Sequence, residues 1–363
     1  MNLDLPEDDI ASFDQSVLAP FVRRRILLPA VIFALSWLIY LFCATGAVLA
    51  MALSAKILLG MVAGVFIANL AIIGHDAIHR SFTSSRLLNR LIGTIAFLPA
   101  LHPYGRWEHH HNRVHHRYTA QIGVDNAFSP MTVAQYRAAS PARRLYYRFM
   151  RSLAGQPFYY LADIWLPRIF LPLGSDARGF TTADWMDFAI VYGWLVGFIA
   201  GLTSLSLLQF DGHIVQALWN ATLFGFVIPF LVWNLFISFV TIVQHTGPRA
   251  RWMMPTGRPS THEQKLRGTV HLRFPEPLDW FFHRVMQHIV HHVNPMVPLY
   301  RLKAAENAVT ASDPDRSVIE TWTPAYHWRL ARECKLYDPI RDGWCRFDAA
   351  RTPRSAPAGF ALQ

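Results

Sequence analysis

The chain is poor in several features on which soluble enzymes and secreted proteins depend. Only 16% of its 363 residues are charged, and it holds three cysteines. Cys43 lies in an apolar run, and neither Cys334 nor Cys345 has a partner at CxxC spacing, so no disulfide framework or cysteine-based metal site is expected. Strand-like alternation of apolar and polar residues is scarce, and there is no internal repeat or low-complexity tract. These shortages favour an all-α chain whose metal chemistry rests on histidine.

Long apolar runs, by contrast, are plentiful. A membrane-spanning helix needs roughly 20 predominantly apolar residues, and uncharged runs cover residues 26–53, 57–74, 188–210 and 215–243. Few residues separate the first two runs, so they predict one helical hairpin, and the last two predict a second. We expect an all-α integral membrane protein with four transmembrane helices and a helical cap that carries the histidines.

The basic residues are distributed unevenly about these runs. Of the 34 Lys and Arg residues, 33 lie before the first run, between the second and third, or after the fourth, and only Lys56 lies elsewhere. Basic residues stay on the cytoplasmic side, so both termini and the cap are predicted to be cytoplasmic, with a bacterial inner membrane favoured. The start, MNLDLPEDDIASFDQS, lacks the basic region and cleavage site of a signal peptide, and no cleavage is expected.

Histidine is abundant, and its spacing is typical of metal ligands. Among 17 histidines, eight fall in three motifs, HDAIH (75–79), HNRVHH (111–116) and HIVHH (288–292). On a helix, positions three and four apart share a face. His245, in VQHTGP, ends the fourth run, and the predicted topology places all four segments at one membrane face. The candidate metal ligands are His75, His79, His111, His115, His116, His245, His288, His291 and His292.

Nine imidazoles are too many for one ion and fit two ions with four or five nitrogens each. Imidazole suits iron, zinc, copper and nickel. The second ring nitrogen of a ligand needs an orienting carboxylate or carbonyl, and the nearby supporting candidates are Asp76, Glu108, His110 and Asp125. Other histidines are predicted to be isolated loop or surface residues: His102, His213, His262 and His327.

The predicted organisation has five segments. They are a cytoplasmic N-terminal segment (1–25), a first transmembrane hairpin (26–79), a cytoplasmic and interfacial helical region with the second motif (80–186), a second transmembrane hairpin (187–245) and a cytoplasmic C-terminal region with the third motif (246–363). The net charge of +10 is assigned to contact with membrane lipids and an acidic partner, and no nucleic acid is expected to bind.

With these motifs in hand, the sequence resembles the membrane fatty acid desaturase family, whose mark is three boxes of the form HxxxH, HxxHH and HxxHH. RYTAQIGVDNAFSP, VQHTGP and HHVNPMVPLYRLKAAENA are similar to segments of the Δ12-type (omega-6) acyl-lipid desaturases. There are two departures. The family's first histidine of the second box falls on Asn112, and this chain has His111 one position earlier. Thr241 stands where some relatives carry asparagine.

The resemblance implies two non-haem iron ions, O2 as co-substrate, and a double bond introduced into an acyl chain, with a lipid-linked, Δ12-like substrate favoured. Acyl carrier protein or coenzyme A as the acyl carrier stays open. The sequence has no flavin or nucleotide fingerprint and no CxxCH haem motif, so a ferredoxin or cytochrome b5-like electron donor is expected. An apolar tunnel would select the bond, and Trp107, Phe97 and Trp280 are candidates for its walls.

Three other functions stay open at this point. A hydroxylase, acetylenase or ketolase of the same diiron superfamily would use the same scaffold. A membrane zinc hydrolase is a different class, but HEQKL at His262 has Leu266 where an HExxH motif needs its second histidine. A metal carrier or bis-histidine haem protein is the third, although such proteins place their ligands in mid-membrane rather than at helix ends.

Overall fold

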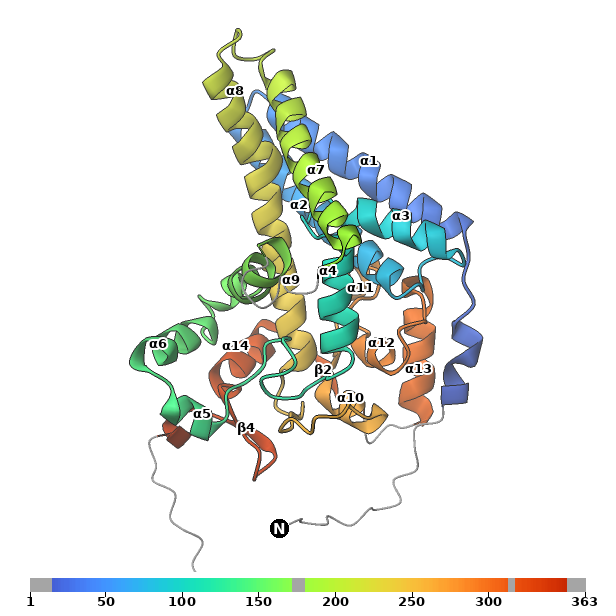
Figure 1. Cartoon of the computed structure of the whole chain (residues 1–363), viewed down its shortest axis with the longest axis vertical. Coiled ribbons are helices and arrows are strands. Elements are labelled where there is room, and N and C mark those ends of the chain that lie inside the picture. The colour runs from blue at the N-terminus through green and yellow to red at the C-terminus, as the bar shows by residue number, and fades with distance from the viewer. Residues whose placement is uncertain (1–14, 172–179, 313–316, 351–363) are drawn as a thin grey trace, which may run out of the picture.

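The four apolar runs form four long helices that pack as two hairpins (Figure 1). The structure is a computed structural model that describes residues 15–171, 180–312 and 317–350. The spanning helices are α1 (Leu27–Leu49), α2 (Leu53–Ile78), α7 (Thr182–Ser206) and a continuous helix over Ile214–His245. In the described part of the chain these four are long and apolar enough to cross a membrane, which confirms the predicted number.

The fourth spanning helix is the one that brings His245 toward the first hairpin. It consists of α8 (Ile214–Asn220), a π-helical segment η6 (Ala221–Val227) and α9 (Ile228–His245). α2 and α9 pack closely because a glycine stands at their crossing. A β-carbon at Gly64 would collide with the carbonyl oxygen of Pro229, and small residues permit such close approach between membrane helices.

A buried lysine ties the two hairpins together at their far ends. The Lys56 ammonium donates to Asn220 Oδ1 at 2.6 Å, to the carbonyl of Val48 at 3.1 Å and to Gln209 Oε1 at 3.3 Å. These acceptors belong to α8, to α1 and to the turn after α7. The one basic residue that the sequence places on this side is therefore satisfied inside the bundle.

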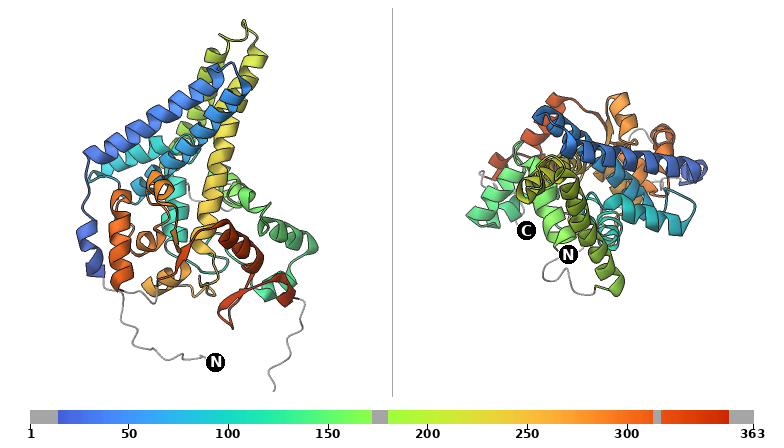
Figure 2. Two further views of the ribbon diagram at one scale, coloured as in Figure 1. Left: turned by 180° about the vertical axis from the view of Figure 1, so that it is seen from behind. Right: turned by 90° about the horizontal axis from the view of Figure 1, so that it is seen from above.

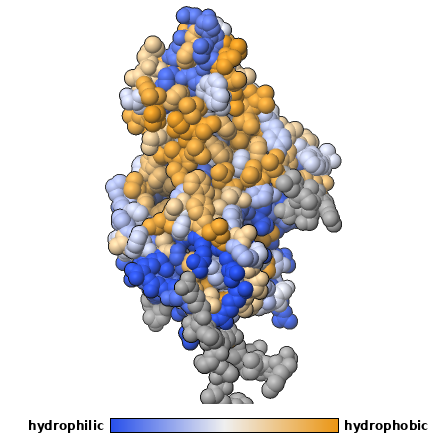
Figure 3. Space-filling view, turned by 90° about the vertical axis from the view of Figure 1, so that its left-hand side faces the viewer, coloured by the Kyte–Doolittle hydropathy of each residue, from blue (hydrophilic) through white to orange (hydrophobic). Residues whose placement is uncertain are grey.

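Large apolar side chains are exposed around the spanning helices. Leu38, Phe42, Leu58 and Val196 are each more than half exposed. Figure 3 shows this apolar surface between a hydrophilic tip and a hydrophilic lower end of the molecule. Exposed apolar surface of this extent marks contact with a membrane, in agreement with the predicted spans.

The remaining elements form a helical cap at one end of the bundle (Figures 1 and 2). η1 (Gln15–Phe21) precedes the first hairpin. Between the hairpins lie α3 (Arg86–Phe97), α4 (Tyr104–Glu108), η2 (His109–His115), α5 (Val133–Ala138), α6 (Pro141–Met150), η3 (Gln156–Phe158) and η4 (Tyr160–Phe170). After the fourth spanning helix come α10 (His262–Gly268), α11 (Glu276–Phe281), α12 (His288–Val293), η7 (Leu299–Arg301), α13 (Leu302–Ser312), α14 (Pro324–Glu333) and η8 (Phe347–Ala350).

Two short strand pairs complete the cap. β1 (His271–Arg273) pairs in parallel with β2 (Ile319–Thr321), and β3 (Leu336–Asp338) pairs antiparallel with β4 (Gly343–Cys345). Each strand has three residues, so the predicted all-α membrane class is confirmed. The junction between bundle and cap is where the ends of α2 and α9 meet η2 and the fully buried helix α12.

Candidate metal centre

The nine candidate ligands converge from these four segments into two adjoining groups. The first group is His75, His79, His111, His116 and His291, and the second is His115, His245, His288 and His292. Within each group the ligand atoms all lie within 4.8 Å of one another. The groups touch, because the ring of His116 stacks on that of His292 with 4.3 Å between centroids. Rings that are more than two hundred positions apart in the sequence therefore share one site.

The nitrogen separations in the first group test whether an ion fits there. His116 Nε2 lies 3.0 Å from His111 Nε2 and 2.9 Å from His291 Nε2. Metal–nitrogen bonds of about 2.1 Å place two ligands about 3.0 Å apart at a right angle and about 3.4 Å apart in a tetrahedron. Neutral imidazoles gain little from facing one another through their nitrogen lone pairs. The separations fit right-angled ligand pairs around a shared ion.

The second group gives the same result. His288 Nε2 lies 2.9 Å from both His245 Nε2 and His292 Nε2, and His292 Nε2 lies 3.2 Å from His115 Nε2. These distances also match right-angled pairs better than the tetrahedral arrangement of a structural zinc site. Each group could therefore hold one ion with coordination positions to spare, and the two ions would be neighbours.

The second motif is a π-helix, and this decides which ring enters which group. In η2 the N–H of His116 donates to the carbonyl of His111 at 2.8 Å, five residues back. Residues five apart then share a face, so His111 and His116 enter the first group while His115 turns to the second. π-Helical turns occur frequently at functional sites. The wider turn also accommodates the extra residue in HNRVHH.

Helix α12 lies between the two groups and serves both. His291 belongs to the first group, whereas His288 and His292, one turn apart, belong to the second. α2 supplies His75 in its last turn and His79 at its end, both to the first group. The spacing of the histidines alone therefore does not show which of the two groups each ring joins.

Hydrogen bonds orient the second ring nitrogens of the second group. His115 Nδ1 lies 2.7 Å from Asp125 Oδ1, and this carboxylate also accepts from the backbone N–H groups of Ala120 and Ala127. Burial by itself would raise the pKa of Asp125, but His115 and the Ala127 N–H outweigh it and hold the pKa below its usual value. A buried carboxylate in this position fixes the tautomer and orientation of its histidine.

Two other rings of this group have oxygen partners. Thr119 Oγ1 lies 3.2 Å from His292 Nδ1, and the carbonyl of Gly268 lies 3.4 Å from His245 Nδ1. The carbonyl of His245 in turn accepts from the indole N–H of Trp252 at 2.9 Å. Three of the four rings therefore have their orientation set by a named partner.

The first group is held mainly by packing. Asp76 Oδ1 lies 3.9 Å from His75 Nδ1, while the other oxygen of Asp76 accepts from the N–H of Leu299 at 2.7 Å. The indole of Trp107 stacks on His111 with 4.4 Å between centroids. Glu108 ends α4, and within the described residues no hydrogen bond joins it to a ring of either group.

Six of the nine rings are neutral at physiological pH. Burial, reinforced by the neighbouring histidines, lowers the pKa well below its usual value for His79, His111, His116, His288, His291 and His292. Metal binding requires the deprotonated imidazole. The site therefore keeps nitrogen lone pairs available for an ion across the physiological range.

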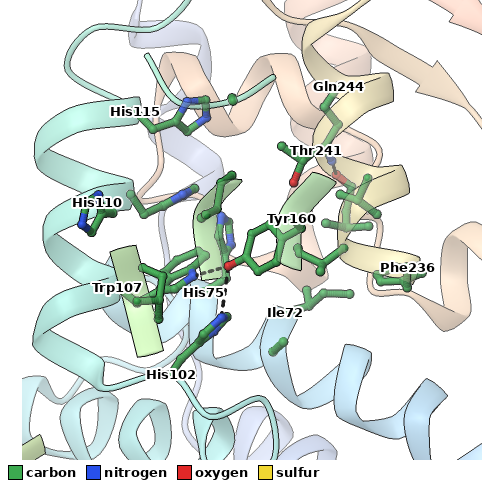
Figure 4. A pocket seen from close by; sticks show the side chains of 18 of the residues that line it. Ile72, His75, His102, Trp107, His110, His115, Tyr160, Phe236, Thr241 and Gln244 are labelled. Atoms are coloured by element: carbon green, nitrogen blue, oxygen red, sulfur yellow. Dashed lines mark hydrogen bonds between the residues drawn. The ribbon is translucent and has the colours of Figure 1, made fainter. Parts of the chain in front are cut away.

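An apolar cavity adjoins both groups (Figure 4). His75 and His111 of the first group and His115, His245 and His288 of the second form part of its wall. The rest is mainly apolar and aromatic, including Ile72, Phe97, Trp107, Ile164, Trp233 and Phe236. Phe97 and Trp107 are walls as predicted. The prediction for Trp280 is wrong, since its side chain is 69% exposed on α11.

Other sequence predictions meet a mixed outcome. His110 lies outside both groups and lines the cavity, and neither of its ring nitrogens has a partner among the described residues. His102 lies in the loop after α3, as predicted, but it is neither isolated nor at the surface, because it is 2% exposed and also lines the cavity. Thr241 lines the cavity one turn before His245. The turn that follows α3 folds His102 back into the interior, which no spacing pattern indicates.

A buried carboxylate that the sequence analysis missed supports α12. Glu306, on α13, accepts from the backbone N–H of Val290 at 3.2 Å, and its other oxygen lies 3.3 Å from His271 Nδ1. Asp279 similarly accepts from Gln287 at 2.9 Å, just before the third motif. Both lie outside the histidine motifs, and the one available signal is an acidic residue on an otherwise apolar helix face.

Comparisons with known proteins agree with this geometry. The family model described as "Fatty acid desaturase" matches residues 47–324. A protein of Synechocystis sp. named "sn-1 oleoyl-lipid 12-desaturase" is 31% identical over 278 residues, which are 74% of this chain and 72% of that protein. "Omega-6 fatty acid desaturase, chloroplastic" of Brassica napus is 27% identical over 307 residues, covering 82% of this chain and 63% of the relative.

The match covers three of the four spanning helices in full, part of α1, and all three histidine motifs. The relatives are similar over most of this chain, not only in the motifs. The chain belongs to the fatty acid desaturase family of oxidoreductases.

Proposed function

We propose that the protein introduces a double bond, at a Δ12-like position, into the acyl chain of a membrane lipid, with O2 as oxidant and two iron ions held by the nine histidines. The observation that carries the proposal is the position of the two groups of imidazoles against the wall of an apolar cavity. The names of the Synechocystis and Picosynechococcus relatives, oleoyl-lipid 12-desaturases, support the lipid-linked substrate and the position.

The ligand set fits iron. Two neighbouring ions, one held by five imidazoles and one by four, would supply the oxidising power needed to attack an unactivated carbon–hydrogen bond. Imidazole suits iron, and the right-angled nitrogen pairs leave coordination positions open. Asp125, Thr119 and the Gly268 carbonyl would fix the rings of the second group during the reaction.

The cavity explains how a featureless chain is held. Its aromatic and aliphatic walls exclude water, and they fix the distance of each methylene from the histidines. Among the lining residues, Trp107, Phe97, Trp233 and Phe236 supply large aromatic surfaces that would confine the acyl chain. An alkyl chain offers no group for acid–base catalysis, so positioning beside the ions is the main work of these residues.

Electron balance requires a partner. Removing two hydrogens from the acyl chain releases two electrons, whereas reducing O2 to two waters consumes four, so two electrons must come from outside. A ferredoxin or a cytochrome b5-like protein, both acidic, would suit the basic cap. The distribution of Lys and Arg supports a cytoplasmic location for the cap and both termini. The relatives from Synechocystis and Picosynechococcus support a bacterial membrane, for which we propose the inner membrane.

Product analysis tests the proposal. The protein is expressed in a bacterium fed labelled oleoyl chains, and the lipids are analysed by mass spectrometry with localisation of the double bonds. A new double bond beyond the existing one, with loss of two hydrogens, is expected, and His288→Ala should abolish it while the exposed His213→Ala retains it. A gain of one oxygen instead would favour the hydroxylase on the same scaffold, and no change in the lipids would contradict the proposal.

A further inference from the structure

Three polar side chains form a hydrogen-bonded row in the apolar wall of the cavity. Trp107 Nε1 donates to Tyr160 Oη at 2.9 Å, and Tyr160 Oη lies 3.1 Å from His102 Nε2 (Figure 4). Their side chains come from α4, η4 and the turn after α3, and all three are buried. Binding of an alkyl chain needs no polar groups in the cavity wall, so substrate binding alone does not explain this row.

Counting hydrogen bonds gives the direction of the row. The indole N–H can only donate, so Tyr160 Oη accepts it. If Tyr160 donates its own proton to His102 Nε2, one polar atom of the row, His102 Nδ1, is left without a partner among the described residues. If His102 Nε2 donates instead, the phenolic proton is also unsatisfied, and each unsatisfied buried polar group destabilises the fold. The favoured row is indole N–H to phenol, and phenol O–H to imidazole.

The row begins at the metal centre. The Trp107 ring stacks on His111 of the first group at 4.4 Å between centroids, with 20° between the ring planes, and lies 5.8 Å from the ring of His75. At the other end of the row, the ring centroid of Trp233 lies 5.8 Å from that of Tyr160 and 5.2 Å from that of His102. Indole and phenol are the aromatic side chains that lose one electron most readily. An unbroken path of oxidisable rings therefore leads from a candidate ligand into the protein.

We propose that Trp107, Tyr160 and His102 form an electron-transfer path that lowers the oxidation level of the metal centre by one electron when the centre becomes oxidised with no acyl chain in the cavity. The inference rests on the proposed function, because it presupposes that O2 is activated at the histidines. It assigns Tyr160 as the residue that holds the oxidation and His102 as the residue that holds the proton.

The step balances in electrons and protons. Tyr160 would lose one electron, which would pass through the Trp107 indole to the ion that His111 would help to hold and lower the charge of that ion by one. The phenolic proton moves along the existing hydrogen bond to His102 Nε2, which leaves a neutral phenoxyl radical and an imidazolium. An oxidised phenol is a far stronger acid than imidazolium, so the proton moves even though burial lowers the pKa of His102 to about 3.

The low pKa of His102 also makes the step reversible. A buried imidazolium is costly, so the proton returns to the phenol once the external one-electron donor has reduced the radical. If the row served only to satisfy polar groups in the wall, Tyr160 would stay unoxidised under all conditions. The two roles therefore differ in a spectroscopic signature rather than in stability.

The test is electron paramagnetic resonance on the iron-loaded protein. Reduced protein in lipid nanodiscs is mixed with O2 without acyl substrate and frozen within milliseconds to seconds. A tyrosyl radical is expected, with hyperfine structure that narrows when the protein contains ring-deuterated tyrosine. Tyr160→Phe should abolish the signal. Tyr159→Phe is the matched control at the neighbouring position, since the Tyr159 hydroxyl bonds to the Asn126 carbonyl and has no part in the row.

A second variant keeps the test decisive if Tyr160→Phe fails to bind iron. His102→Gln preserves an acceptor for the phenol but cannot take its proton, so the radical yield should fall several-fold and its g-values, which report the hydrogen bond to the phenoxyl oxygen, should shift. Iron content and lipid products are measured in parallel. Wild-type protein that makes no unsaturated product contradicts the proposed function. Product formation without a tyrosyl radical, or a radical that is unchanged in Tyr160→Phe or His102→Gln, overturns this inference.

Discussion

The two histidine groups differ in what holds their rings. In the second group Asp125, Thr119 and the Gly268 carbonyl hydrogen-bond to the second ring nitrogens. In the first group Asp76 Oδ1 lies 3.9 Å from His75 Nδ1, beyond hydrogen-bonding distance, and Trp107 stacks on His111. Hydrogen-bonded ligands are oriented before the ion arrives. We therefore expect the second site to bind its ion more tightly and the first site to exchange its ion more readily.

The largest effects come from removing one ligand in each group. His288→Ala in the second group and His79→Ala in the first should each lower desaturation by more than about 100-fold, because loss of a ligand costs more than loss of an orienting partner. Iron content should fall from two ions per chain toward one in both variants, measured by metal analysis. If His79→Ala kept both ions, the first group would not be a metal site.

The second comparison separates two neighbouring rings on η2. His111→Ala should lose most of the iron in the first site, whereas His110→Ala should keep it. Of these two histidines, His111 belongs to the first group and His110 does not. His110→Ala controls for disturbance of the π-helix, since both changes fall in the same turn. Iron loss in His110→Ala with retention in His111→Ala would reverse the assignment.

A matched pair of carboxylate variants tests the difference in orientation. Asp125→Asn should weaken iron binding at the second site by about 10- to 100-fold, the usual cost of losing an orienting carboxylate. Asp76→Asn should have a smaller effect, since an amide oxygen can still accept from the Leu299 N–H. Competition with a chelator gives both affinities, and equal losses would show that the two groups are held alike.

The smallest predicted effect concerns a single hydroxyl. Thr119→Val removes the 3.2 Å contact with His292 Nδ1 and keeps the shape of the side chain. A neutral hydrogen bond contributes about 1 kcal/mol, so the affinity of the second site for iron should fall by about fivefold. The same chelator assay measures this affinity. A loss as large as that of Asp125→Asn would show that the Thr119 hydroxyl matters as much as the Asp125 carboxylate.

The sequence predicted the parts of this site that follow from local pattern. Apolar runs fixed the number of spanning helices, and the motif spacing identified all nine histidines that the structure brings together. The sequence could not predict how these histidines divide into two groups, because the division depends on the π-helical turn that places His111 and His116 on one face. Whether a segment forms an α- or a π-helix is decided by the packing around it.

Tertiary contacts account for the other differences. The sequence pattern predicts an isolated loop histidine at position 102, but the turn after α3 buries His102 against Tyr160. Trp280 was a candidate for the tunnel wall, but it lies on the exposed face of α11 at the surface. Glu306 contacts α12 only because α13 packs there. The division into five segments and the cytoplasmic orientation stay predictions, since they concern the membrane rather than contacts within the chain.

The central claim is that two ions sit side by side among the nine rings. Anomalous diffraction at the iron absorption edge, from crystals of the purified iron-loaded protein, tests it most directly. We predict two adjacent iron peaks, one surrounded by His75, His79, His111, His116 and His291 and the other by His115, His245, His288 and His292. A single peak, or a signal at the zinc edge and none at the iron edge, would contradict the account.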